Sequence, residues 1–321
     1  MQKKFKISLT KLIGPVILGL ILYFKIDFKK LLLIIDSVQW PYLFYVVIIL
    51  LIKSPINPYR WQYILKRLSI NCSFKKIFNT YYLTMLLGLI TPGRVGEIIF
   101  RMFILKKEGY LLNKSLVSII LDRLADLFFL LLFSSIGVLV FLKLLGLKTL
   151  LIILIPLFGI ILFLILIQKD FSKKLLEKFF LFLIPKKFCP NSKIYFKNFI
   201  ENLQKFTLKD YLIILLLTSG TWIIIIGSMY VLARGWNITA IPFFYFALSI
   251  ILARLVGLLP ISIGGLGTRE AILLGLFSFF SISSEKTIGF SLSMFVLAVL
   301  VNGMIGVYIW LRNQEPFYEK K

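Results

Sequence analysis

The sequence predicts an all-α polytopic membrane protein with about six full spans and two re-entrant helical hairpins, arranged as inverted repeats. Of its 321 residues, 59% are hydrophobic, and the mean hydropathy is +0.93, far above that of a soluble domain. Several apolar runs are long enough to cross a bilayer. Two interruptions of similar composition also lie in opposite halves of the chain, which is typical of transporters built from inverted repeats.

The apolar runs define the expected elements in chain order. They lie near 9–24, 38–52, 77–91, 116–142, 149–167, 211–233, 240–259, 271–282 and 287–311. The first run follows several lysines, as in a signal peptide, but it lacks a small-residue cleavage site and is expected to stay as a helix. No segment is long and polar enough for a separate soluble catalytic domain. Residues 1–321 are therefore expected to form a single integral membrane domain.

Each interruption opens with a proline, passes through glycines and ends with an arginine and a glutamate. They read TPGRVGE at 91–97 and PISIGGLGTRE at 260–270. Proline and glycine unwind a helix and free backbone polar groups, which lipid cannot satisfy. Such backbone persists only inside protein or beside a water-filled cavity. The pair of interruptions therefore predicts a substrate site near the middle of the bilayer.

The distribution of lysine and arginine indicates how the chain crosses the membrane. The connection 53–76 holds six basic residues and no acidic one, and the connection 168–210 holds ten lysines. If every run spans fully, the second connection falls outside, against the positive-inside rule. If instead 77–106 is a re-entrant hairpin entered from the cytoplasm, that connection becomes a basic cytoplasmic loop. The alternative, in which both interruptions are ordinary kinks or loops between full spans, remains open.

A matching hairpin over 240–282, entered from outside, completes the topology. Both termini then lie in the cytoplasm of a multi-pass protein of the cell (plasma) membrane. The inverted repeats cover roughly 38–142 and 211–311. The connection 53–76 mixes aromatic and basic side chains, including Arg60 and Trp61, and is expected to lie at headgroup level.

Charged residues within or beside the apolar runs are few, and burial of such a residue is costly unless it is paired. They are Arg94, Glu97, Arg101, Asp122, Arg123, Asp126, Arg254, Arg269 and Glu270. Asp122 and Asp126 share one helix face because they are four residues apart, and Arg123 turns away by about 100°. Both carboxylates are expected to face the interior and contact Arg94 or Arg101. Two roles remain open for them: a lock between helices, or direct contact with substrate.

The arginines of the two interruptions are the candidate headgroup ligands. Arg94 and Arg269 follow glycines that expose backbone N–H groups, and a guanidinium beside such groups suits a phosphate or carboxylate. Glu97 and Glu270 could neutralise these arginines when no substrate is bound. The alternative is that the Arg–Glu pairs only stabilise the hairpin tips. The candidate substrate-binding set is Gly93, Arg94, Gly96, Glu97, Asp122, Arg123, Asp126, Gly264, Gly265, Gly267, Arg269 and Glu270.

Other chemistry is disfavoured by composition. The chain contains no histidine, which removes histidine acid–base catalysis and histidine metal sites. Cys72 and Cys189 are isolated, so neither a disulfide framework nor a thiolate metal site is expected. No cofactor and no catalytic residue is assigned. The net charge of +24 favours contact of the basic loops with anionic lipid over nucleic-acid binding.

At these residues the chain resembles a known family, the flippase-like transmembrane region of lysylphosphatidylglycerol synthases and its stand-alone relatives. The resemblance extends over nearly the whole chain. The matching pieces are Arg60-Trp61, Thr91 to Glu97, Asp122-Arg123 with Asp126, and Pro260 with Gly264 to Glu270. In the synthases a cytoplasmic transferase domain follows this region, whereas this chain ends at Lys321. The resemblance therefore implies lipid translocation or a related membrane role rather than aminoacyl transfer.

Three functions are compatible with these observations. The first is a transporter, not an enzyme, that moves an anionic or zwitterionic lipid, or a lipid-linked precursor, between leaflets by its headgroup. The second is a membrane-embedded lipid-modifying enzyme, for which only four carboxylates are available as acid–base groups. The third is a non-transporting partner of an envelope biosynthetic enzyme such as a transferase.

Overall fold

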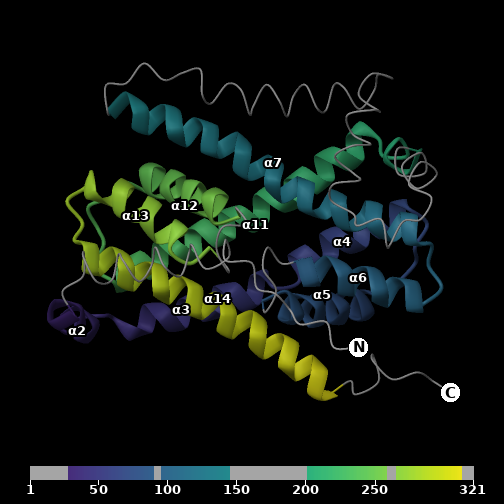
Figure 1. Ribbon diagram of the computed structural model, residues 1–321, viewed down its shortest axis with the longest axis horizontal. Coiled ribbons are helices and arrows are strands. Elements are labelled where there is room, and N and C mark those ends of the chain that lie inside the picture. The colour runs from purple at the N-terminus through teal and green to yellow at the C-terminus, as the bar shows by residue number, and fades with distance from the viewer. Residues whose placement is uncertain (1–27, 90–94, 145–200, 259–264, 313–321) are drawn as a thin grey trace, which may run out of the picture. The chain divides into compact units, whose positions relative to one another are not determined.

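The computed structural model describes residues 28–89, 95–144, 201–258 and 265–312, and every regular element in these ranges is an α-helix. The helices are α2 (Phe28–Asp36), α3 (Trp40–Lys53), α4 (Ile56–Arg67), α5 (Phe74–Leu89), α6 (Val95–Lys107), α7 (Leu112–Leu144), α11 (Leu208–Gly235), α12 (Phe243–Gly257), α13 (Thr268–Ser278) and α14 (Ser284–Arg312) (Figure 1). The all-helical prediction therefore holds for the described part of the chain.

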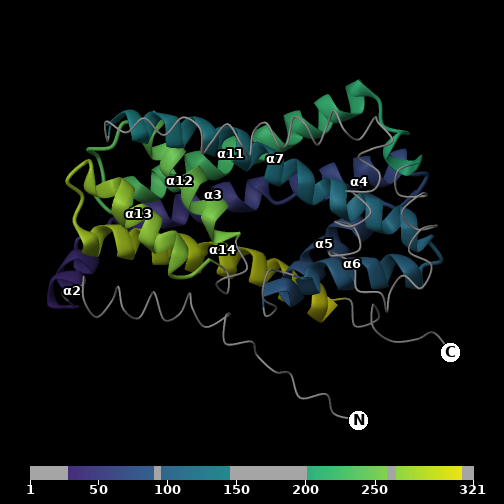
Figure 2. The ribbon, with the colours of Figure 1, turned by 45° about the horizontal axis from the view of Figure 1, so that its top comes forward.

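Four described helical segments are long and apolar enough to cross a membrane. The helix α7, which contains one of them, is a single unbroken helix in both views (Figures 1 and 2). The four segments are Trp40–Arg67, Lys114–Phe141, Leu208–Gly235 and Ser284–Arg312. Each corresponds to one of the six predicted full spans. The other two predicted spans, 9–24 and 149–167, lie outside the described residues, as does most of the basic connection 168–210.

The helices beside the interruptions are shorter than a span. A spanning helix needs about 20 apolar residues, whereas α12 has 15 residues and α13 has 11. The two pack together from end to end: the Phe246 and Phe277 rings are 5.9 Å apart, and a Cβ on Gly265 would lie 3.0 Å from Gly257 Cα. This close approach and the φ of +79° at Gly265 both require glycine there.

The helices α5 and α6 are also short, with 16 and 13 residues. Near the start of α5 and the end of α6, Lys76 forms an ion pair with Glu108. Near their other ends, a Cβ on Gly88 would lie 2.9 Å from Glu97 Cβ. The two helices are therefore an antiparallel pair, as α12 and α13 are. Re-entry of either pair into the membrane, and the inverted repeat that it implies, remain predictions.

The described helices divide into two compact units, each with its own buried core. The first unit comprises 1–56, 78–100 and 220–321, and the second comprises 57–77 and 101–219. In the first unit, aromatic side chains from α12, α13 and α14 form the centre of the core, where Phe246, Phe277 and Phe290 are fully buried. In the second, Trp61 and Ile64 of α4 and Val117 and Ile119 of α7 are fully buried.

A glycine in α14 makes room for a tryptophan of the first unit. A Cβ at Gly289 would overlap two atoms of the Trp236 ring. We therefore expect Gly289→Ala to destabilise the protein by about 1–3 kcal/mol, because overpacking forces side chains and backbone to move. The thermal unfolding midpoint in detergent measures this effect.

Gly303 of the same helix provides the matched control, because nothing lies within 4 Å of its added Cβ. Gly303→Ala is expected to be neutral or slightly stabilising, since alanine favours helix over glycine. Trp236→Phe should recover part of the stability lost in Gly289→Ala. An unchanged midpoint in Gly289→Ala would show that the predicted contact is absent.

Candidate functional site

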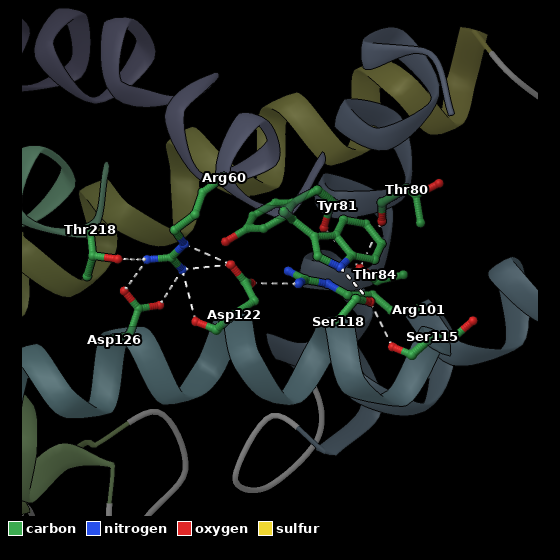
Figure 3. Close-up of polar contacts among 11 residues, drawn as sticks. Arg60, Thr80, Tyr81, Thr84, Arg101, Ser115, Ser118, Asp122, Asp126 and Thr218 are labelled. Carbon is green, nitrogen blue, oxygen red and sulfur yellow. Dashed lines mark hydrogen bonds and ion pairs between the residues drawn. The ribbon is translucent and has the colours of Figure 1, made fainter. Parts of the chain in front are cut away.

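The first candidate site centres on Arg60 of α4, a residue of the second unit whose side chain is 0% exposed. Its Nε donates to Asp122 Oδ1 at 2.8 Å, and its Nη2 donates to the Asp122 main-chain oxygen at 3.1 Å. Nη1 and Nη2 each donate to one carboxylate oxygen of Asp126, both at 2.9 Å, and Nη1 also donates to Thr218 Oγ1 at 2.8 Å. Figure 3 shows the guanidinium between these groups. All five of its N–H donors therefore have an acceptor.

Asp122 joins Arg60 to a second arginine. Its other oxygen, Oδ2, accepts from Arg101 Nη1 at 3.0 Å, and the Arg101 side chain is also 0% exposed (Figure 3). The Arg101 guanidinium lies 4.7 Å from the centre of the Trp61 ring, whose indole N–H donates to Ser118 Oγ at 3.2 Å. Cation–π contact and the shared carboxylate both lower the cost of burying Arg101. The predicted contact between Asp122 and Arg101 is therefore present.

The two arginines and two aspartates, with Thr218, form what we call the Arg60 cluster. Asp122 and Asp126 reach the same guanidinium because they lie four residues apart on α7, as the sequence predicts. Their environments differ: the Asp122 side chain is 2% exposed, whereas that of Asp126 is 25% exposed. Within the cluster each arginine has an aspartate partner, which lowers the cost of burying these charges.

The helix that carries Arg60 follows closely on the one before it. Trp40–Arg67, which comprises α3 and α4, forms one span-length segment. Pro58 lies in the first turn of α4, where proline is tolerated because the first N–H groups of a helix have no partner within it. Arg60 and Trp61 are buried inside the protein, and the headgroup-level position expected for 53–76 stays a prediction.

The second candidate site lies in the first unit, at the start of α13. Arg269 pairs there with the adjacent Glu270, and both are buried. Glu270 Oε1 accepts from Arg269 Nε at 3.1 Å, from Arg269 Nη2 and from Ser291 Oγ at 2.8 Å. Arg269 Nε also donates to Ser291 Oγ at 2.9 Å, and its guanidinium lies 5.5 Å from the centre of the Phe295 ring. Arg269, Glu270 and Ser291 form what we call the Arg269 cluster.

A glycine turn leads into this cluster. Gly267 has a φ of +86°, a conformation that side chains rarely adopt, and it precedes the first residue of α13. Its N–H was expected to face a headgroup, but it donates to Glu270 Oε2 at 2.6 Å. Glu270 therefore caps its own helix and neutralises Arg269 at the same time.

The remaining predicted site residues are distributed as follows. Gly96 and Glu97 are buried in the first turn of α6, and Gly265 is buried beside Gly257. Arg123 is partly buried, as is Arg254. Gly93, Arg94 and Gly264 lie outside the described residues, so the predicted approach of the two interruptions to each other is not described either.

Sequence reasoning missed Arg60, Thr218 and Ser291 as members of these clusters. Arg60 was assigned to a connection because two prolines and several basic residues follow the apolar run that ends near residue 52. Thr218 and Ser291 are single hydroxyls in apolar helices, and only their arginine partners distinguish them. In the described part of the chain, no group of three or more histidine, cysteine, aspartate or glutamate residues could hold a metal ion.

A family model described as the lysylphosphatidylglycerol synthase TM region matches residues 8–306, which include both clusters. No curated protein matches the chain.

Proposed function

This chain belongs to the lysylphosphatidylglycerol synthase TM region family, and from that membership we propose that it moves a phosphate-bearing lipid between the leaflets of the membrane. The family and the four span-length helical segments make it a multi-pass membrane protein of lipid-related processes. The proposal goes further, to transport rather than catalysis, with an anionic or zwitterionic lipid, or a lipid-linked precursor, as substrate. It also includes a plasma-membrane location with both termini in the cytoplasm.

The observation that carries the proposal is the burial of arginines among helices that are otherwise apolar. Arg60, Arg101 and Arg269 are each no more than 2% exposed. Burial of an ionisable residue inside a membrane protein costs free energy, and such a residue commonly marks a path for a polar substrate. A lipid headgroup that crosses the bilayer needs compensation for its phosphate, and a guanidinium supplies it through paired, charge-assisted hydrogen bonds.

Arg269 is the proposed headgroup ligand in the first unit, and Arg94 is its proposed counterpart. In the described contacts, Arg269 uses Nε and Nη2, while Nη1 makes no hydrogen bond. A phosphate could therefore bind the Nη1 edge, with Glu270 still capping Gly267. Glu97, Glu270 and the glycines of the interruptions are proposed to shape the path beside these arginines.

Reconstitution of the full-length chain tests the proposal. Vesicles of phosphatidylglycerol and phosphatidylethanolamine would carry a trace of phosphatidylglycerol labelled on its acyl chain with a dithionite-sensitive fluorophore. Dithionite bleaches only the outer leaflet, so about half of the signal survives unless lipid exchanges between leaflets. We expect clearly less than half to survive, with no imposed gradient, with a pH gradient or with a membrane potential.

Two controls make the result specific. Vesicles that contain an unrelated polytopic protein should keep half of their signal, and an entrapped soluble fluorophore should report any leakage of dithionite. Survival of half the signal under all three conditions would refute lipid transport by this chain alone. Mass spectrometry of the recovered lipid would reveal a changed headgroup if the protein were instead a lipid-modifying enzyme.

A further inference from the structure

We propose that the edge of Arg60 that holds Asp126 is a binding site for the phosphodiester of a lipid, and that Asp126 occupies this site until the lipid displaces it. The inference rests on the proposed function, because it names a contact that a transported headgroup would make. It adds a second phosphate site, in the second unit, whose ligand is Arg60, a residue that the candidate set from the sequence does not include.

The bonds of Arg60 separate into a fixed set and an exchangeable set. Nε and Nη2 bind Asp122, and Nη1 binds Thr218. Thr218 Oγ1 donates its proton to Ile214 O at 2.7 Å, so it presents only lone pairs to the arginine. These three bonds hold the guanidinium in place without Asp126. The other two donors, one from Nη1 and one from Nη2, point in parallel at the Asp126 carboxylate (Figure 3).

Two parallel N–H groups bind phosphate as readily as carboxylate, because both present two oxygens at a similar spacing. The two aspartates are not equivalent for such an exchange. One carboxylate oxygen of Asp122 accepts from Arg60 and the other accepts from Arg101, and the Asp122 side chain is 2% exposed. Both oxygens of Asp126 accept from one edge of Arg60, and the Asp126 side chain is 25% exposed, so Asp126 is the more accessible of the two aspartates.

The charge of Asp126 indicates the class of ligand that can replace it. With Asp126 turned away, Arg60 and Arg101 carry two positive charges against the one negative charge of Asp122 in the described ion pairs. A phosphodiester carries one negative charge, as the Asp126 carboxylate does. A phospholipid headgroup can therefore replace the charge that Asp126 supplies to Arg60 in the structure.

The two parallel N–H groups of Arg60, which we call the fork, are accessible to lipid only in molecules whose Asp126 has turned away. The apparent affinity for lipid is reduced in proportion to the fraction of such molecules. Removal of the carboxylate should therefore strengthen binding. We expect Asp126→Asn to lower the Kd for dihexanoyl-phosphatidylglycerol by about tenfold or more, measured by calorimetric titration of the full chain in neutral detergent. Arg60→Lys in the Asp126→Asn background should remove this gain, because lysine keeps the charge but loses the fork.

Three further titrations identify the ligand. Dihexanoylglycerol, which lacks the phosphate, should show no gain in Asp126→Asn, and inorganic phosphate should show a smaller gain than the lipid. Asp36→Asn, at an exposed aspartate outside both clusters, should leave the Kd unchanged. An unchanged Kd in folded Asp126→Asn, a gain that persists with Arg60→Lys, an equal gain for dihexanoylglycerol or an equal gain for free phosphate would each overturn the assignment to a lipid phosphodiester.

A second measurement uses the unaltered protein, so it serves even if Asp126→Asn does not fold. Dicyclohexylcarbodiimide modifies accessible carboxyl groups in membranes, and mass spectrometry locates the product. Dihexanoyl-phosphatidylglycerol should increase labelling of Asp126 and leave Asp122 protected, whereas equal or reduced labelling of Asp126 would contradict the exchange. Both measurements report lipid binding at Arg60 rather than lipid transport. Each can therefore contradict the binding site while transport is observed, or support the site while no transport is observed.

Discussion

Asp122→Asn is expected to be among the most destabilising single substitutions in the described part of the chain, with a loss of about 3–5 kcal/mol. The change removes the negative charge that lies between two fully buried arginines. Asparagine also presents an NH₂ group to one of them, so a donor faces a donor. The folded yield after size-exclusion chromatography in detergent, together with the thermal unfolding midpoint, measures the loss.

The same substitution at Asp36, which is exposed at the end of α2, provides the control and should change stability by less than about 0.5 kcal/mol. Asp126→Asn should fall between the two, because its carboxylate pairs with Arg60 but is 25% exposed. A yield and midpoint for Asp122→Asn that match those of Asp36→Asn would show that the Arg60 cluster does not contribute to folding.

Glu270→Gln is expected to cost a similar amount, about 3–5 kcal/mol, in the first unit. Glutamine can keep an acceptor toward Arg269, but it no longer neutralises that buried guanidinium. Its NH₂ group then faces the Gly267 N–H, which loses its acceptor at the start of α13. The same detergent assays report the change.

Glu285→Gln provides the matched control, because Glu285 lies partly exposed in the first turn of α14. It should change stability by less than about 0.5 kcal/mol. Ser291→Ala should lie between the two, since it removes one hydrogen-bond partner of the pair but no charge. If Glu270→Gln is as stable as Glu285→Gln, the Arg269–Glu270 pair has no structural role.

Hydropathy and helical periodicity were sufficient to predict the four span-length helical segments of the described residues and part of the Arg60 cluster. The four span-length segments coincide with predicted runs, and the spacing of Asp122 and Asp126 predicted a shared face. These features depend on local sequence alone. The residue that binds this face could not be predicted in the same way. Arg60 lies 62 residues before Asp122, and it belongs to a second helix, α4, that begins directly after Pro55.

The glycine turns show a different limit. The sequence indicated a glycine turn before Arg269 that frees backbone N–H groups from the helix, and the structure has such a turn, with a positive φ at Gly265 and Gly267. It did not determine which acceptor would take them. Glu270 competes with any ligand for the Gly267 N–H, and the distance of 2.6 Å shows that it does so successfully in this state. Such competition depends on three-dimensional geometry rather than on residue type.

The central claim is that the chain transports lipid and that Arg269 contacts the headgroup. Its most direct test is the dithionite assay with Arg269→Lys, compared with the unaltered protein at equal amounts of folded, reconstituted chain. Lysine keeps the charge beside Glu270 but cannot offer a fork to a phosphate. We predict transport by the unaltered protein and at least about a tenfold slower rate for Arg269→Lys, beyond any change in its unfolding midpoint. Equal rates, or no transport by either protein, would contradict the claim.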